Sequence, residues 1–400
     1  MSAGTASPVV VIGSGLAAVS FATTLRRGGY DGPLRIVGED AEPPYDRPPL
    51  SKSFLKDGDA LKIRLDTGPL ADVDWVLGRR AAAIDATQRH VALDNGERIA
   101  WGTLVLATGT RARPLPVLAP IGCPVLTLRT LDDARRLRAL LVPDTRLLLV
   151  GAGVIGLELA ATARALGASV TVLEAQPRVM VRSVPATLSR FVEQRHRDES
   201  VDLRLGRKLL EARPGAVLLD DGSSVAADLV VVGIGVVAND ELAAAAGLAC
   251  DDGIVVDAHG RTAAEGIWAI GDVARQPHPL TGRHQRIETW ANAQDQAVAA
   301  ARRWLDAAAP PYVSPPWFWS DQYELRIQGV GLPGGSNEVV RGDPASGRFS
   351  LLQFEGDRLV GATCVSSARD FSPLRKLVGR EFPGRVSSFA DTAIDLRKLG

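Results

Sequence analysis

Residues 147–158 read Leu147-Leu148-Leu149-Val150-Gly151-Ala152-Gly153-Val154-Ile155-Gly156-Leu157-Glu158. The apolar run predicts a buried parallel strand, and the Ala-rich sequence that follows predicts a helix. The glycines between them have the G-x-G-x-x-G spacing. The first glycine allows a tight turn, the second lets the backbone approach a pyrophosphate, and the third lets helix and strand pack closely. Because phosphates bind at the free N–H groups of a helix N-terminus, we expect a dinucleotide here.

A second copy of this pattern lies near the N-terminus. The strand predicted at 8–12 leads into Gly13-Ser14-Gly15-Leu16-Ala17-Ala18, where alanine takes the place of the third glycine, an allowed variant. A helix is expected to about Arg27, because Gly28-Gly29 follow as a stop signal. The next strand, 34–37, is followed by Gly38-Glu39.

The mid-chain copy continues in the same way. Its helix is expected to about Leu166, and the strand 170–173 ends at Glu174. The acid follows the first glycine by 23 residues there and by 26 residues in the N-terminal copy. One such loop is a weak signal. A whole βαβ unit repeated at an offset of 138 residues makes a chance match improbable.

The acid at the end of the second strand indicates which nucleotide binds. A carboxylate there accepts hydrogen bonds from the adenosine ribose hydroxyls and repels a 2′-phosphate. Glu174 therefore favours NAD over NADP. Ala175-Gln176-Pro177 bring no cation directly after it, although Arg178 lies nearby.

Two further segments favour FAD at the N-terminal loop. Residues 103–109 and 267–272 each read as a strand that ends in a small-residue turn. Asp272 is expected at a carboxyl strand end, where ligands of α/β sheets bind, and its carboxylate can accept a bond from a ribityl hydroxyl. Alternatively, or in addition, it is the N-cap of a helix. Two dinucleotides on one chain suggest electron transfer between them.

Composition limits the remaining classes. A chain of 400 residues is expected to form two or three domains. Lys plus Arg equals Asp plus Glu, so charge gives no reason to expect a nucleic acid or membrane partner. No apolar run is long enough to span a bilayer, and Met1 to Pro8 lacks a signal-peptide pattern, so we expect a cytoplasmic protein. Cys123, Cys250 and Cys364 are read as buried reduced thiols, and no metal site is expected.

These motifs, taken together, resemble those of a known protein family. The motifs are similar to those of two-dinucleotide flavoprotein reductases of the glutathione-reductase fold. They are the two glycine loops and residues 107–109, 233–235 and 270–272. Pro44-Tyr45-Asp46-Arg47-Pro48-Pro49-Leu50-Ser51-Lys52 and Trp317-Phe318-Trp319-Ser320-Asp321-Gln322-Tyr323 narrow the resemblance to NADH-dependent ferredoxin reductases of bacterial oxygenases. It extends almost end to end and is strongest toward the reductases of biphenyl-type dioxygenases, with putidaredoxin reductase as a more distant member.

The resemblance implies an α/β fold with two Rossmann-like domains, for FAD and NAD, and a C-terminal α+β domain. The FAD domain would be split into 1–110 and 242–316, with the NAD domain at 111–241 and the last domain at 317–400. In that last domain we expect a strand at 358–365 and a basic helix from about Ala368.

The glycine loops and the resemblance together assign the candidate site residues. Those for FAD are Gly13, Gly15, Ala17, Glu39, Arg47, Lys52, Ala81, Arg129, Asp272, Trp290 and Trp319. Those for NAD are Gly151, Gly153, Ile155, Gly156, Glu158, Glu174 and Gly235.

Lys52 and Glu158 are the candidate catalytic residues. By resemblance, Lys52 lies beside the flavin N5 and O4 edge, where an ammonium favours the electron-rich reduced ring; the alternative is an ordinary surface lysine. Glu158, expected in the first turn of the NAD helix, would by resemblance pair with Lys52 and contact the nicotinamide side. The alternative is an acid placed there for the helix dipole.

Trp290 and Trp319 are expected to flank the flavin. By resemblance, Trp290 opens a helix whose N-terminus points at the flavin pyrimidine and stabilises negative charge there. Trp319 would contact the flavin from the last domain. For both, core packing is the alternative. Arg47 would by resemblance lie close to the FAD phosphates, whereas a plain surface ion pair with Asp46 would contribute little.

Cysteine placement argues against related activities. Disulfide reductases of this fold need a cysteine pair beside the flavin, and NADH oxidases and peroxidases need one redox cysteine near residues 41–45. Here that segment is Ala41-Glu42-Pro43-Pro44-Tyr45.

We therefore expect an FAD-dependent NADH:ferredoxin oxidoreductase. Its partner would be a small [2Fe–2S] ferredoxin, of the Rieske type that feeds an aromatic-ring dioxygenase. The alternatives are a reductase for a P450 ferredoxin or a rubredoxin, and a flavin-binding interaction protein of the apoptosis-inducing-factor type. From Arg369 onward seven basic and four acidic residues leave a positive excess that can steer an acidic ferredoxin, or simply form a solvated face. A monomer or weak homodimer is expected.

Overall fold

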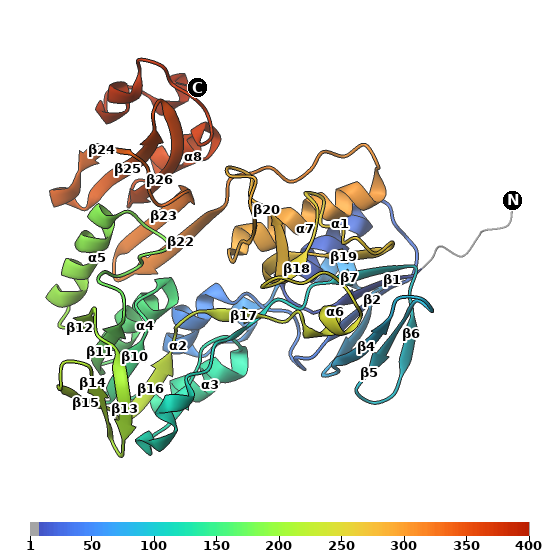
Figure 1. The fold of residues 1–400 in the computed structure, drawn as a ribbon, viewed down its shortest axis with the longest axis horizontal. Helices are drawn as coiled ribbons and strands as arrows, with labels where there is room; N and C mark the ends of the chain where they lie inside the picture. Colours follow the sequence, from blue (N-terminus) through green and yellow to red (C-terminus); the bar gives the residue numbers. More distant parts are fainter. Residues whose placement is uncertain (1–7, 400) are drawn as a thin grey trace, which may run out of the picture. The chain divides into compact units, whose positions relative to one another are not determined.

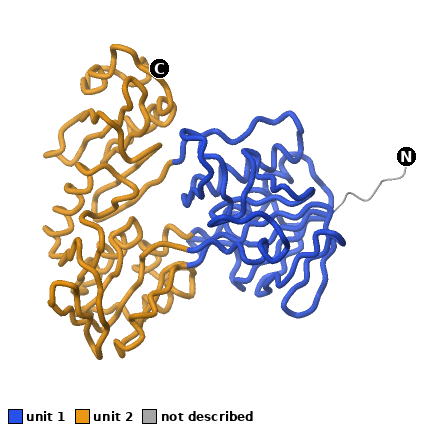
Figure 2. Tube along the Cα trace, viewed as in Figure 1, with its two compact units in different colours: residues 1–46, 61–111, 237–316 blue, residues 47–60, 112–236, 317–400 orange. Residues whose placement is uncertain are grey.

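The computed structural model describes residues 8–399. Residues 1–7, on which the signal-peptide expectation mainly depends, lie outside the described part. The chain forms two compact units, each built from three segments (Figure 2). Unit 1 runs through 1–46, 61–111 and 237–316, and unit 2 through 47–60, 112–236 and 317–400. The domain boundaries given above stay a prediction.

Unit 1 is built on a five-stranded parallel sheet with the order β19-β7-β1-β2-β3 (Figure 1). Its strands are β1 (Val9–Ile12), β2 (Leu34–Gly38), β3 (Asp74–Leu77), β7 (Thr103–Leu106) and β19 (Ile267–Ala269). In register, Ile12 lies opposite both Val37 and Leu106. The strands predicted at 8–12, 34–37, 103–109 and 267–272 are therefore neighbours, and their carboxyl ends share one edge.

Alternate residues of β1 face opposite sides of this sheet, as the pleat requires. Val9 and Val11 pack in one buried cluster with α1 (Leu16–Arg27) and α7 (Trp290–Leu305). Val10 and Ile12 pack in another, with the antiparallel sheet of β4 (Ala81–Asp85), β5 (His90–Leu93) and β6 (Arg98–Ala100). The remaining elements are α6 (Glu241–Ala245), β18 (Ile254–Val255), β20 (Ala274–Pro277) and β21 (His284–Arg286).

Unit 2 repeats the parallel plan, with the strand order β12-β11-β10-β16-β9. Its strands are β9 (Val125–Leu126), β10 (Arg146–Val150), β11 (Ser169–Glu174), β12 (Asp202–Leu205) and β16 (Leu229–Val232). The helices are α2 (Ser53–Asp57), α3 (Leu131–Leu140), α4 (Val154–Ala165) and α5 (Ala186–Asp198). The meander of β13 (Leu209–Arg213), β14 (Ala216–Leu219) and β15 (Ser224–Ala226) contributes to the buried cluster that contains Leu148 and Val150.

The last part of unit 2 is an antiparallel sheet with the order β22-β23-β26-β25-β24, followed by a helix. The elements are β22 (Trp317–Gln322), β23 (Leu325–Gly331), β24 (Asn337–Asp343), β25 (Arg348–Glu355), β26 (Arg358–Val365) and α8 (Ala368–Leu377). The strand predicted at 358–365 and the helix from Ala368 are confirmed. The α/β class with two Rossmann-like sheets and a C-terminal α+β domain is confirmed as well.

Short elements complete the fold. The pair β8 (Thr110–Ala112) and β17 (Val236–Ala238) forms a two-stranded sheet. The 3-10 helices are Pro48–Ser51, Leu61–Ile63, Gly68–Leu70, Pro116–Ile121, Gly271–Val273, Pro344–Ser346, Val386–Ala390 and Leu396–Lys398. None of the helices within residues 8–399 meets the length and hydropathy that a membrane crossing needs.

Candidate functional site

The glycine loop of unit 1 packs tightly against the backbone at Gly13 and is unobstructed at Gly15. Gly13 has φ +112°, and a Cβ added there would collide with the carbonyl oxygen of Ala107. Its N–H donates to Val37 O at 2.7 Å. Gly15 is the N-cap of α1, and a Cβ added there would meet no atom within 4 Å. The backbone N–H groups of the helix start are therefore accessible to a phosphate.

The second loop has the same geometry. Gly151 also has φ +112°, and a Cβ there would collide with the carbonyl oxygen of Gly233. Gly153 caps α4 and again has no atom within 4 Å of an added Cβ. A Cβ on Gly156 would press on Gly151 O, as expected of the glycine that allows close helix packing. The predicted repeat is confirmed, and both loops fit a pyrophosphate.

Glu174 lies at the end of β11, held by two backbone N–H groups. Its Oε2 accepts from Ala152 N–H at 2.8 Å and its Oε1 from Gln176 N–H at 2.8 Å. The carboxylate is therefore fixed beside the glycine loop, where ribose hydroxyls are expected. Arg178 donates its guanidinium N–H groups to the carbonyls of Val181 and Val184. Because that cation is bound within its own loop, it does not counter the preference for NAD.

Two further predicted NAD residues lie on the same unit. Ile155, in the first turn of α4, is 47% exposed although it is apolar. Gly235 has φ +107°, a conformation that glycine adopts readily. Both are thus suited to close approach by a ligand.

Asp272 lies in unit 1 at the carboxyl end of β19, inside the 3-10 turn Gly271–Val273. Thr110 Oγ1 donates to Asp272 Oδ2 at 3.5 Å, and Arg286 Nη1 donates to its carbonyl at 3.5 Å. The chain continues from Ala274 as strand β20, so the helix N-cap alternative for Asp272 is wrong. A Cβ on Gly271 would lie 2.9 Å from Cβ of Ala17, so this turn and the start of α1 are adjacent.

Trp290 is the first residue of α7, as predicted. The helix is capped by Thr289, whose Oγ1 accepts from Asn292 N–H at 3.1 Å. Trp290 Nε1 donates to Asp46 Oδ1 at 2.8 Å. Burial raises the pKa of Asp46, and the bond from Trp290 opposes the rise. The indole is thereby oriented by a hydrogen bond at the helix N-terminus.

The remaining FAD candidates of unit 1 differ in exposure. Glu39 is exposed just beyond β2, where the ribose of a dinucleotide is expected. Ala81 begins β4 and belongs to the buried core. Arg47, Lys52, Arg129 and Trp319 belong instead to unit 2. Of these, Arg47 is exposed, and the Arg129 backbone N–H donates to Asp133 at the start of α3.

In unit 2, the partly buried Lys52 forms an ion pair with the buried Glu158. Lys52 Nζ lies 3.0 Å from Glu158 Oε1, with side chains 18% and 4% exposed. The ammonium also lies 5.9 Å from the ring centroid of Trp319, within the range of a cation–π contact. Lys52 is therefore not an ordinary surface lysine. The pairing that the resemblance implied is present.

Glu158 is the fifth residue of α4, because the helix is capped by Gly153 and begins at Val154. The expectation of an acid in the first turn is therefore wrong, and a helix-dipole role does not explain Glu158. Burial raises the pKa of its carboxyl group. Lys52 opposes that rise, and so do hydrogen bonds from Ser51 and Ser320.

Ser51 and Ser320 were not anticipated as site residues. Ser51 Oγ donates to Glu158 Oε2 at 2.6 Å, and Ser320 Oγ donates to Oε1 at 2.8 Å. Both serines lie inside the stretches that carried the family resemblance. Nothing in the linear pattern linked them to Glu158, because they are 107 and 162 residues away from it. The fold alone brings them together.

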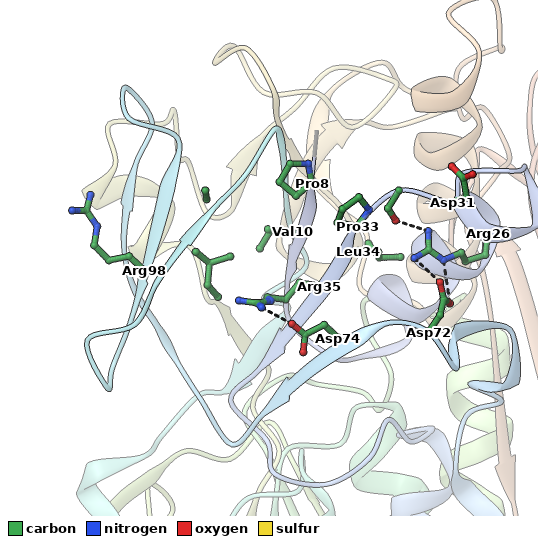
Figure 3. A pocket seen from close by; sticks show the side chains of 13 residues that line it. Pro8, Val10, Arg26, Asp31, Pro33, Leu34, Arg35, Asp72, Asp74 and Arg98 are labelled. Carbon is green, nitrogen blue, oxygen red and sulfur yellow. Dashed lines mark hydrogen bonds and ion pairs between the residues drawn. The ribbon is translucent and has the colours of Figure 1, made fainter. Parts of the chain in front are cut away.

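Unit 1 also has a hollow of about 560 Å³, whose lining includes Pro8, Leu34 and Arg35 (Figure 3). It is lined at the amino ends of β1 and β2, whereas the glycine loop of unit 1 follows the carboxyl end of β1. Two of its three arginines form ion pairs, Arg26 with Asp72 at 3.0 Å and Arg35 with Asp74. The third, Arg98, donates to Gln88 Oε1 at 3.0 Å. We therefore assign it no role in nucleotide binding. Among residues 8–399, no group of three or more His, Cys, Asp or Glu side chains can hold a metal ion.

Comparison with known proteins agrees with this geometry. The family model for pyridine nucleotide-disulphide oxidoreductases matches residues 7–297. The chain belongs to this family. The model for the reductase C-terminal domain matches residues 317–400.

Relatives of known name span nearly the whole chain. The 3-phenylpropionate/cinnamic acid dioxygenase ferredoxin–NAD(+) reductase component of Photorhabdus laumondii is 38% identical over 96% of this chain and 98% of its own. Rhodocoxin reductase of Rhodococcus erythropolis is 41% identical over 97% and 93%. The covalent putidaredoxin reductase–putidaredoxin complex contains a chain with a TM-score of 0.93 and 36% identity, covering 99% of this chain and 98% of that chain. The chain is thus similar to ferredoxin–NAD(+) reductases in sequence and fold.

Proposed function

We propose that this chain is an FAD-dependent NADH:ferredoxin oxidoreductase that serves an aromatic-ring-hydroxylating dioxygenase. The observation that carries the proposal is the pair of glycine loops with matching geometry, one in each unit. Two dinucleotides on one chain suit electron transfer from one to the other. The names of three relatives, all reductase components of dioxygenase systems, contain the word ferredoxin, and we extend this acceptor to the present chain.

When bound, FAD accepts two electrons from NADH as a hydride and releases them one at a time, which no side chain can do. The chain's own residues bind and orient the reactants. Gly13 and Gly15 shape the FAD diphosphate site, and Asp272 is placed to accept from the ribityl chain. Gly151 and Gly153 do the same for the NADH diphosphate, and Glu174 holds its ribose.

Lys52 and Glu158 are the proposed catalytic pair. The ammonium stabilises negative charge that develops on the flavin, provided that it stays charged and fixed. Glu158 holds it at 3.0 Å. Trp319 and Trp290 are proposed to contact the flavin ring, and Arg47, Glu39, Ala81 and Arg129 to complete the FAD site.

We also propose domain boundaries, an acceptor type and a cellular location. The FAD domain comprises 1–110 and 242–316, the NAD domain 111–241, and the C-terminal domain 317–400. The acceptor is a Rieske-type [2Fe–2S] ferredoxin, and the protein is cytoplasmic. The names of dioxygenase components among the relatives support the acceptor type.

The test is anaerobic reduction of the purified FAD-loaded protein by NADH, followed by addition of ferredoxins. Rapid bleaching of the flavin absorbance by NADH, slower bleaching by NADPH, and reduction of a Rieske-type ferredoxin are expected. Faster turnover with a P450-type ferredoxin or a rubredoxin would replace the proposed acceptor. Bleaching without turnover on any carrier would favour an interaction protein instead.

A further inference from the structure

The hydrogen bonds that reach Glu158 continue beyond Ser320. Gln322 Nε2 donates to Ser320 Oγ at 3.0 Å. Gln322 Oε1 lies 2.9 Å from His196 Nε2, and His196 Nδ1 lies 3.0 Å from the Tyr323 hydroxyl. Ser320 and His196 are fully buried, and Gln322 is 1% exposed. A single chain of bonds therefore runs from Tyr323, beside α5, through β22 to α4.

In this series of hydrogen bonds, each donor points along the series toward Glu158. Because the Gln322 amide nitrogen donates to Ser320, its oxygen accepts, so His196 carries its proton on Nε2. Burial lowers the pKa of His196 to about 4, so the ring is neutral at pH 7, with Arg195 lowering and Glu199 raising that pKa. Nδ1 of the neutral ring then accepts from the Tyr323 hydroxyl. Bonds aligned in one direction polarise and strengthen one another.

The outer end of the chain is held in a strained turn. Tyr323 has φ +54°, which is unfavourable for a bulky residue and persists only where the surroundings enforce it. Those surroundings come from α5. The Arg195 guanidinium lies 5.0 Å from the Tyr323 ring centroid and bonds both carboxylate oxygens of Glu324, at 3.1 and 2.8 Å. The His196 ring meets the Tyr323 ring edge-on at 5.0 Å.

We propose that Gln322, His196 and Tyr323 are positioning residues that hold Ser320 against Glu158 and so fix the Lys52–Glu158 pair. The hydrogen bonds to Glu158 come from Ser51, Lys52 and Ser320, so the three positioning residues act through Ser320. The inference rests on the proposed role of that pair. The turn between β22 and β23 thereby contributes to hydride transfer from a distance.

The main test compares Gln322→Met with Gln353→Met in the FAD-loaded protein. Gln353 is an equally suitable buried glutamine, 3% exposed, whose amide donates to Glu338 within the same sheet. In anaerobic stopped flow, Gln322→Met is expected to lower the rate of flavin reduction by about 3- to 10-fold, the factor that one neutral hydrogen bond corresponds to. Gln353→Met is expected to keep the wild-type rate.

The pH profile separates positioning from general damage. The hydrogen bond from Ser320 lowers the pKa of Glu158, and Lys52 is the charged group that acts on it. Gln322→Met removes the hydrogen bond that holds Ser320 in place. In the pH dependence of the flavin-reduction rate, the limb that reports the ionisation of Glu158 is therefore expected to move to higher pH. Tyr323→Phe, which deletes one hydroxyl and keeps the fold, is expected to shift the same limb in the same direction, by less.

A readout independent of activity is the ring nitrogen spectrum of His196 by NMR. Glu158→Gln is expected to shift the Nε2 and Nδ1 signals of His196, although two residues separate them along the chain of bonds. Two results would overturn the positioning role and leave the proposed function standing. The first is that the His196 signals do not shift in Glu158→Gln. The second is that Gln322→Met and Tyr323→Phe both keep wild-type rates and pH profiles, while flavin reduction in Glu158→Gln is slow. A wild-type rate in Glu158→Gln would instead remove the proposed role of the ion pair.

Discussion

Replacing Lys52 with methionine removes the cation from a carboxylate that is 4% exposed. Methionine keeps most of the side-chain length, so the change tests charge more than packing. Glu158 retains its bonds from Ser51 and Ser320, but it loses the charge that most opposes the rise of its pKa. We expect this variant to be destabilised in a way that depends on pH.

The magnitude follows from the burial of the pair. Removing one partner of a buried ion pair costs about 3–5 kcal/mol while the other stays charged. Protonation of Glu158 relieves that cost. In the folded protein, burial raises the pKa of the Glu158 carboxyl group above its ordinary value of 4.5. Above that pH the folded protein therefore binds more protons than the unfolded chain. Stability therefore falls as pH rises above about 4.5, by at most about 1.4 kcal/mol per pH unit, until the folded pKa is passed.

The assay is the melting temperature of the wild type and the Lys52→Met variant across pH 4.5 to 8. For a unit of this size, about 3 kcal/mol corresponds to about 6–12 °C. We expect a small difference near pH 4.5 that grows toward pH 8. Between Glu158→Gln and the double variant Lys52→Met/Glu158→Gln the difference in melting temperature should not vary with pH, because neither protein carries a carboxyl group at position 158. A difference of constant size in the single variant would refute the buried-charge reasoning.

Three further results are expected. Glu174→Ala, which deletes the carboxylate that accepts from Ala152 N–H, should raise the KM for NADH by about 10-fold, as expected for a charge-assisted bond of about 1.5 kcal/mol; an unchanged ratio of NADH to NADPH use would count against Glu174 as the discriminating acid. Gly156→Ala, whose new Cβ would press on Gly151 O, should weaken NADH binding in difference spectroscopy and leave FAD content unchanged. Rising ionic strength should slow ferredoxin reduction while NADH-to-dye activity stays flat, because the basic excess after Arg369 would be screened; parallel loss of both activities would contradict docking through that segment.

The sequence was sufficient for the parts of the fold that are local. Apolar runs followed by spaced glycines predicted β1, α1, β10 and the end of α4 closely, because a strand, a tight turn and a helix end depend on neighbouring residues. The positions of the acids at the ends of β2 and β11 were predicted from the repeated βαβ pattern. Glu174 could be placed beside its loop because the parallel register fixes strand ends together.

The surroundings of Glu158 could not be predicted in this way. Its partners come from the segment at Ser51 and Lys52 and from β22, which no periodicity links to α4. The helix start was also misjudged by one turn, because Gly153, rather than the third glycine, is the cap. Similarly, the chain after Asp272 turns into a strand, which small residues such as Ala274 do not specify by themselves.

The matching shapes of the two glycine loops have a consequence for nucleotide sorting. FAD and NADH share an adenosine diphosphate half, and each loop offers that half nearly the same backbone, with φ/ψ of −81°/−171° at Gly15 and −77°/−177° at Gly153. The backbone at these two caps therefore gives no basis for distinguishing the two cofactors by their shared half. Correct loading must depend on the distal ring of each molecule and on the walls that receive it. Free ADP, which lacks any distal ring, is expected to compete for both loops alike.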